Sequence, residues 1–135
     1  MDIASINVGD ALPEKTLSVS QELINEYAQI CGDYNTLHVD VEAMKKNEMF
    51  GGSTIAHGTI NVEPVLQAIC AAQGTTWPAE GTSIDLQFRA PVKPGMTISS
   101  SLKVTEKQAG AVVCDMQIVD QDGKPCVRGS AVVPL

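Results

Sequence analysis

The hydrophobic pattern of this chain changes its period once, after Gly81, and this change constrains the fold most. Before it, apolar residues recur at the spacing of one face of an amphipathic helix. After it, apolar and polar residues alternate, as they do in half-buried strands. A helical half followed by a run of strands, in a chain of 135 residues, predicts one α+β domain over residues 1–135.

The first predicted helix covers residues 21–31. Ser20 is a suitable N-cap for it, and Gly32 can end it in the left-handed conformation. A polar loop is expected over residues 32–40. The inner face of the helix is predicted to carry Leu23, Ile24, Tyr27, Ile30 and Cys31.

A long apolar helix is predicted over residues 59–74, and its composition indicates that it is mostly buried. Pro64 belongs either to its first turns or to a kink, because proline has no backbone N–H and crowds the preceding turn. Before this helix, Asp40 can cap a short helix of its own. Trp77, which follows the long helix, is expected to pack against the loop around it.

The second half of the chain predicts antiparallel strands. Ile84, Leu86 and Phe88 alternate with polar residues and define the first of them. Further strands are expected over residues 98–104, 112–118 and 127–133, joined as hairpins through the turns between them. The N-terminal segment is expected to add a strand. The long helix would then pack on this sheet.

Charge and composition exclude several classes of function. Lys and Arg total 9 against 16 Asp and Glu, a net charge of −7, which is unfavourable for nucleic acid. The sequence has no apolar run of the ~20 residues that a membrane helix needs, and we expect a cytoplasmic protein.

We predict no metal site, because two histidines and no CxxC pair offer few ligands. Buried free thiols are expected at Cys31, Cys70, Cys114 and Cys126.

Two short segments carry residues that could do chemistry. Asp33, Asn35 and His38 share one polar loop, and a carboxylate with an imidazole can hold a water and exchange protons with it. Alternatively, all three serve only turns and backbone groups. Gly58 precedes a helix, where a free N–H can stabilise an oxyanion. His57 beside it is either part of this site or a buried capping histidine.

In order along the chain, YAQICGDYNTLHVD (residues 27–40) and GGSTIAHGT (residues 51–59) resemble the signature of the MaoC-like (R)-specific enoyl-CoA hydratase family. LQFRAPVKPGMTI (residues 86–98) and QDGKPCVRGSAVV (residues 121–133) are also similar to family segments, so the resemblance covers most of the chain. The positions that match the signature are Tyr27, Ala28, Gly32, Asp33, Asn35, His38, Asp40, Ile55, Ala56, His57 and Gly58.

The resemblance implies a hot-dog fold, in which an antiparallel sheet is wrapped around a long central helix. It implies that Asp33 and His38 are the catalytic pair and that the Gly58 N–H binds the thioester oxygen. Asn35 and His57 would support them. The implied reaction is addition of water to a trans-2-enoyl thioester to give the (R)-3-hydroxyacyl thioester, or the reverse dehydration.

The substrate of such an enzyme is an acyl-CoA or an acyl carrier thioester, so CoA or phosphopantetheine is part of the substrate and no separate cofactor is expected. Arg89 and Lys93 are candidates for binding its phosphates, or are solvated charges on the surface. A homodimer, or a heteromer with another hot-dog chain, is expected because one unit exposes a sheet edge and an apolar face. The alternatives are a hot-dog thioesterase and a non-catalytic subunit that binds acyl thioesters.

The sequence departs from the family pattern at three places. Thr36 stands where proline is usual, and Met96 where an aspartate is frequent. Asn61, Glu63 and Pro64 introduce polarity and a proline into the central helix, which could reshape the acyl pocket.

Overall fold

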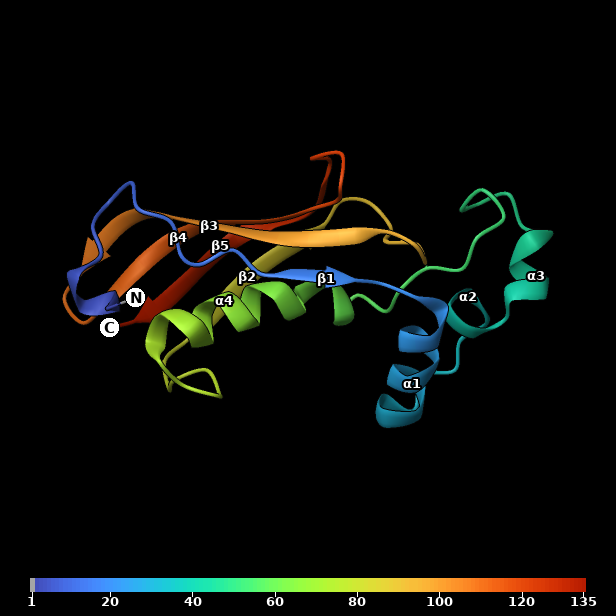
Figure 1. Ribbon diagram of the computed structural model, residues 1–135, viewed down its shortest axis with the longest axis horizontal. Coiled ribbons are helices and arrows are strands. Elements are labelled where there is room, and N and C mark those ends of the chain that lie inside the picture. The colour runs from blue at the N-terminus through green and yellow to red at the C-terminus, as the bar shows by residue number, and fades with distance from the viewer. Residues whose placement is uncertain (1) are drawn as a thin grey trace.

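The computed structural model describes residues 2–135 and contains one antiparallel sheet of five strands (Figure 1). The strands are β1 (Thr16–Ser18), β2 (Ser83–Phe88), β3 (Thr97–Gln108), β4 (Ala111–Val119) and β5 (Pro125–Pro134). The helices are α1 (Gln21–Cys31), α2 (Thr36–Val39), α3 (Val41–Lys45) and α4 (Glu63–Gln73), with 3-10 turns η1 (Ile3–Ser5) and η2 (Ile60–Val62).

The order of the strands in the sheet is β1-β3-β4-β5-β2. The hairpins β3–β4 and β4–β5 form as predicted, and β2 returns to pair with β5, so that Leu86 lies opposite Gly129. The predicted N-terminal strand is β1, which pairs with β3 at the other edge. The two edge strands are therefore the ones that flank the helical segment in the sequence.

Helix α4 packs across one face of the sheet and supplies the centre of the core (Figure 1). Its inward residues pack against β3, β4 and β1, while Glu63 and Gln67 remain exposed. The fully buried side chains include Val65, Ala68, Ile69, Ile98, Leu102, Val112, Met116, Ile118, Val127 and Val133. This is the predicted hot-dog arrangement.

The ends of α1 follow the predicted capping. Ser20 Oγ accepts a hydrogen bond from the Leu23 N–H, and Gly32, with φ 76°, ends the helix. The predicted inner face was partly wrong: Ile30 is 83% exposed and Cys31 is also exposed. The C-terminal end of α1 points away from the sheet (Figure 1), so the core formed by residues 2–135 does not cover these side chains.

The loop expected over residues 32–40 contains a helical turn, α2, that the prediction missed. Asn35 starts this turn, because its Oδ1 accepts a hydrogen bond from the Leu37 N–H. Asp40 caps α3 as expected. Pro64 lies in the first turn of α4, where a missing N–H costs no hydrogen bond, and so it produces no kink.

Some burial predictions were wrong. Trp77 is 81% exposed and Phe88, at the end of β2, is 56% exposed. Cys70 is half-buried, whereas Cys114 and Cys126 are buried as expected. Burial raises the pKa of the Cys114 thiol to about 11, which keeps it protonated and unreactive. No helix among residues 2–135 is long and apolar enough to span a membrane.

We predict that Gly129→Ala weakens the pairing of β2 with β5. A Cβ atom at this position would lie 2.0 Å from the Asp85 carbonyl oxygen, so the two strands would have to separate. The free energy of unfolding, measured by urea titration, should fall by about 1–3 kcal/mol. Ser130→Ala, at the exposed neighbouring position, is the control and should have little effect. Unchanged stability of Gly129→Ala would contradict the close strand contact.

Candidate active site

His38 and Asp33 face each other across a short gap. His38 Nε2 lies 3.8 Å from Asp33 Oδ2; the His38 side chain is 11% exposed and that of Asp33 is 53% exposed. The other ring nitrogen, Nδ1, lies 2.7 Å from the Ile55 carbonyl oxygen. Because a carbonyl oxygen only accepts, Nδ1 carries a proton. In the neutral ring, Nε2 is therefore the free acceptor that points towards Asp33.

The loop that holds this pair is organised by its own polar side chains. Asp33 Oδ1 accepts a hydrogen bond from the Asn35 N–H at 3.1 Å. The Asn35 carbonyl then accepts the His38 N–H at 2.9 Å, within the turn that the Asn35 side chain caps. Asn35 thus lies between Asp33 and His38 in the sequence and fixes the conformation of the loop that carries them.

Two further residues, which were not predicted from the sequence, hold the backbone of His38 in place. Gln21 Nε2 donates to the His38 carbonyl at 2.8 Å, and Thr54 Oγ1 donates to Gln21 Oε1 at 2.5 Å. They come from α1 and from the segment before α4, far apart in the sequence. Only the three-dimensional contact identifies them, since a polar residue at a helix start has no distinctive pattern.

His57 lies directly behind His38. It is 3% exposed, and the two imidazole rings stack with centroids 4.0 Å apart. His57 Nε2 donates to the Asp33 carbonyl at 2.9 Å, whereas its Nδ1 has no hydrogen-bond partner among residues 2–135. His57 therefore ties the segment before α4 to the loop that carries Asp33.

One potential ligand atom from each of Asp33, His38 and His57 lies within 4.8 Å of the others. Such a cluster can hold a water molecule, and the two imidazoles with one carboxylate are also a ligand set that transition metals accept. The expectation of a metal-free site therefore stays a prediction.

Gly58 lies two residues before Ile60, where the helical stretch formed by η2 and α4 begins. Its carbonyl accepts the Asn61 N–H at 3.1 Å, and its own N–H has no backbone acceptor among residues 2–135. The start of a helix carries partial positive charge, so this N–H can bind a developing oxyanion. A Cβ atom on Gly58 would lie 2.8 Å from Phe88 Cζ, so the Phe88 ring rests on this glycine.

Two cavities meet at His38, Gly58 and Phe88. The first, here called the Asn61 cavity, has a volume of about 330 Å³ and is also lined by Phe50, Ile55, Ala56, Asn61, Arg89, Ala90 and Pro91. The second, the Tyr27 cavity, has about 410 Å³ and is also lined by Tyr27, Cys31, Asp33, His57 and Thr59. The pair of groups capable of acid–base chemistry thus lies where a ligand could occupy both cavities.

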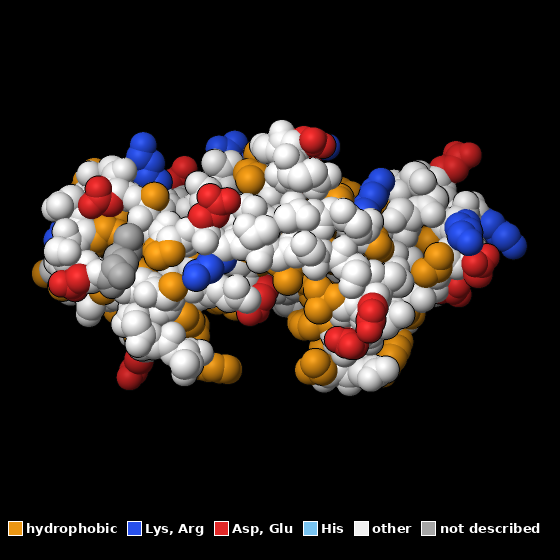
Figure 2. All heavy atoms as spheres, viewed as in Figure 1, with side chains coloured by type: hydrophobic (Ala, Val, Ile, Leu, Met, Phe, Trp, Pro, Cys, Tyr) orange, Lys and Arg blue, Asp and Glu red, His pale blue; other side chains and the backbone are white. Residues whose placement is uncertain are grey.

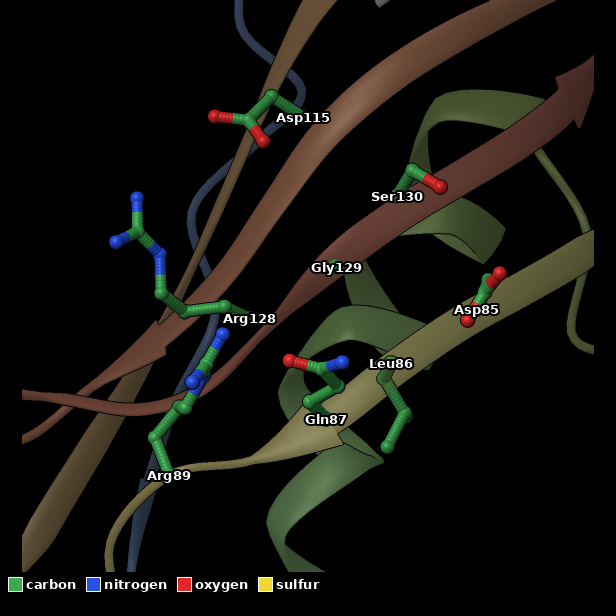
Figure 3. Close-up of a pocket in the computed structure, with 8 residues that line it drawn as sticks. All are labelled: Asp85, Leu86, Gln87, Arg89, Asp115, Arg128, Gly129 and Ser130. Atoms are coloured by element: carbon green, nitrogen blue, oxygen red, sulfur yellow. The ribbon is translucent and has the colours of Figure 1, made fainter.

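The two predicted phosphate-binding residues lie apart from each other. Arg89 lines the Asn61 cavity, but Lys93 lines neither cavity and its Nζ lies beside Gly51. Arg89 also lines a shallow pocket on the sheet, together with Arg128 of β5 (Figure 3). Asp85 and Asp115 line the same pocket, so this surface carries both charges. Arg128, which lies opposite Gln87 in the β2–β5 pairing, was not among the predicted site residues.

A sheet packed on one central helix defines a hot-dog protein, and in this one a carboxylate–imidazole pair lies beside the start of that helix. The model of the MaoC like domain matches residues 7–122. The chain belongs to this family of MaoC-like domains.

Solved structures agree with this assignment. The R-hydratase PhaJ1 of Pseudomonas aeruginosa is 31% identical, with 97% of this chain and 83% of that chain covered and a TM-score of 0.77. The (R)-hydratase of A. caviae involved in PHA biosynthesis is 21% identical, with 97% and 98% covered and a TM-score of 0.83, and supports the fold alone. No curated protein matches the sequence.

We predict that Gly58→Ala displaces the Phe88 ring. Phe88 is a half-exposed side chain that can rotate away from the added methyl group, so the free energy of unfolding should change by less than about 1 kcal/mol. The protein has only two phenylalanines, Phe50 and Phe88, so their aromatic NMR signals can be assigned by substitution. The Phe88 signals should move more than those of Phe50. Unmoved Phe88 signals would mean that the ring does not rest on Gly58.

Proposed function

We propose that this protein is a hydro-lyase that adds water to a trans-2-enoyl thioester to give the (R)-3-hydroxyacyl thioester, or catalyses the reverse dehydration. The observation that carries the proposal is the Asp33–His38 pair, with its 3.8 Å gap, beside the free Gly58 N–H. Membership of the MaoC-like family and the 31% identity to an R-hydratase support it.

In the proposed reaction, the thioester oxygen accepts the Gly58 N–H while a water molecule lies between Asp33 and His38. The water oxygen bonds to Cβ, and the water proton passes to His38 Nε2, the ring nitrogen free to accept it. The electron pair of the double bond moves towards the thioester, where Gly58 stabilises the enolate-like oxygen. The Asp33–His38 pair then returns a proton to Cα from the same face of the substrate, which makes the addition syn.

Asp33 has a different task from His38 in this scheme. Its carboxylate holds the second hydrogen of the water and stabilises the imidazolium that forms when His38 takes the proton. The reaction changes no oxidation state overall and requires no electron carrier. CoA or phosphopantetheine takes part only as the carrier of the acyl group, and Arg89 is the proposed contact for its phosphates.

The proposed assembly pairs this chain with a second hot-dog unit, either another copy or a different chain. Strand β2 is an edge strand that pairs only with β5 among the described residues, and apolar side chains border the hollow beneath α4 (Figure 2). Leu66, Cys70 and the exposed Trp77 line a cavity of about 380 Å³ on this side. Two structural neighbours are heteromeric complexes, ChsH1-ChsH2 and HadBC of Mycobacterium tuberculosis, with 18% and 13% identity.

We predict that Asp33→Asn and His38→Gln each lower the rate of crotonyl-CoA hydration by roughly 10²–10⁴-fold. The assay follows loss of the enoyl thioester absorbance, with a free-thiol assay in parallel. Asp122→Asn, in the exposed turn between β4 and β5, is the matched control and should keep full activity. Thiol release without hydration would identify a thioesterase instead. Binding of the thioester with neither reaction would favour a non-catalytic subunit.

We predict that the purified protein has a mass of about twice 14.3 kDa by light scattering when it pairs with itself. Trp77 is the only tryptophan, so its fluorescence reports on this surface alone. Dilution that dissociates the pair should shift its emission to longer wavelength as water reaches the ring. A monomer that binds no second hot-dog chain would contradict the proposed assembly.

A further inference from the structure

A side-chain amide that no protein acceptor uses opens into the Asn61 cavity. Asn61 is 4% exposed, and its Oδ1 is sealed from solvent without a hydrogen-bond donor among residues 2–135. Its Nδ2 is the atom that remains accessible, and this nitrogen has no acceptor among the described residues either. The amide therefore presents free N–H groups to the cavity that the residue lines.

The orientation of this amide follows from what each of its ends would cost when sealed. The sealed oxygen leaves one acceptor unsatisfied, whereas the reversed amide would seal two N–H donors without an acceptor. The observed orientation is the less costly one, and it keeps the donors on the cavity side. It still carries a cost that an apolar side chain, such as those of the buried neighbours Ile60 and Val65, would avoid. A ligand therefore explains this residue better than the packing of the core does.

The 3-10 geometry before the central helix places this donor beside the Gly58 N–H. The Asn61 N–H donates to the Gly58 carbonyl at 3.1 Å, and the Ile60 N–H donates in the same way to the His57 carbonyl. Side chains three residues apart in a 3-10 turn lie on the same face, and Gly58 has no side chain to occupy that face. Both residues line the Asn61 cavity, together with His38. An oxygen bound to the Gly58 N–H is therefore within reach of the Asn61 amide.

The rest of the cavity wall indicates what these donors would bind. Phe50, Ile55 and Ala56 make much of the wall apolar, and no carboxylate lines it among residues 2–135. A cation would be repelled by the N–H groups and would lack a counter-charge. An oxygen that gains negative charge during a reaction benefits most, because an apolar wall screens the contact less than water does. The oxygen of an enolate-like thioester is an atom of this kind.

We propose that Asn61 is a second catalytic donor, whose Nδ2–H binds the thioester oxygen beside the Gly58 N–H and stabilises the charge that develops there. The inference rests on the proposed function, which places a thioester at Gly58. It adds only a hydrogen bond, and proton transfer remains with Asp33 and His38. Two donors on one oxygen also fix the plane of the thioester relative to the Asp33–His38 pair.

The test observes the thioester carbonyl group directly. Butyryl-CoA cannot be hydrated, and its carbonyl stretching band, isolated by carbon-13 labelling in difference infrared spectra, moves to lower frequency when hydrogen bonds to the oxygen strengthen. Spectra of the bound ligand are compared between the wild type and two variants. Asn61→Leu replaces the amide by an apolar group of similar size, and Asn61→Ala avoids steric blocking by a new side chain. Gln29→Leu, the same kind of change at an exposed position of α1, is the matched control.

We expect the band of bound butyryl-CoA to lie at lower frequency in the wild type than in either Asn61 variant, and Gln29→Leu to match the wild type. Both Asn61 variants should also lower kcat for crotonyl-CoA hydration by roughly 10²–10³-fold. The change in KM should be much smaller, because the hydrogen bond is strongest when the oxygen carries charge. The same band position for bound ligand in the wild type and in both variants would overturn the proposal, whatever the change in rate.

Thermal unfolding separates loss of the contact from misfolding. Asn61→Leu should melt close to or above the wild-type temperature, because it removes an unsatisfied buried oxygen. The two proposals also fail separately. If the band depends on Asn61 but the wild type hydrates no crotonyl-CoA, only the hydratase proposal is wrong. If hydration proceeds and neither substitution moves the band, only the inference is wrong. A wild type that binds neither thioester would overturn both.

Discussion

The packing of α4 against β3, β4 and β1 determines where the start of the central helix lies relative to the sheet. Its inward side chains are fully buried, so the helix cannot move along the sheet without opening the core. Its N-terminal end is thereby placed at the end of the sheet where α1, α2 and α3 gather (Figure 1). The site forms at this end because the start of the central helix and the helical segment meet there.

Two backbone carbonyl groups orient the imidazole rings at this end of the sheet. The Ile55 carbonyl sets which nitrogen of His38 is free, and the Asp33 carbonyl does the same for His57. Backbone groups are held by the fold, so they orient the imidazoles without adding charge to the site. Asp33 is the more exposed member of the pair, whereas His38 is nearly buried but lines both cavities.

Periodicity predicted the strands, α1 and the long helix because burial of one face drives each of them. The motif resemblance identified the loop of Asp33 and His38, which periodicity leaves undefined. Ile30 and Trp77 were misjudged because apolar character was taken to mean burial within this chain. Gln21, Thr54 and Arg128 could not be predicted, since their partners lie far away in the sequence. The free amide N–H of Asn61 is visible only once its surroundings are known, although the sequence already marked the position as a departure.

The Phe88 ring that rests on Gly58 belongs to β2, an edge strand with one side free. Any chain that pairs with that edge also touches the residue that covers the proposed oxyanion site. If the proposed assembly uses this edge, Phe88 takes part in both assembly and substrate access, so a substitution of Phe88 affects both. A partner surface of that kind and the proposed catalytic centre could not diversify independently over evolutionary time.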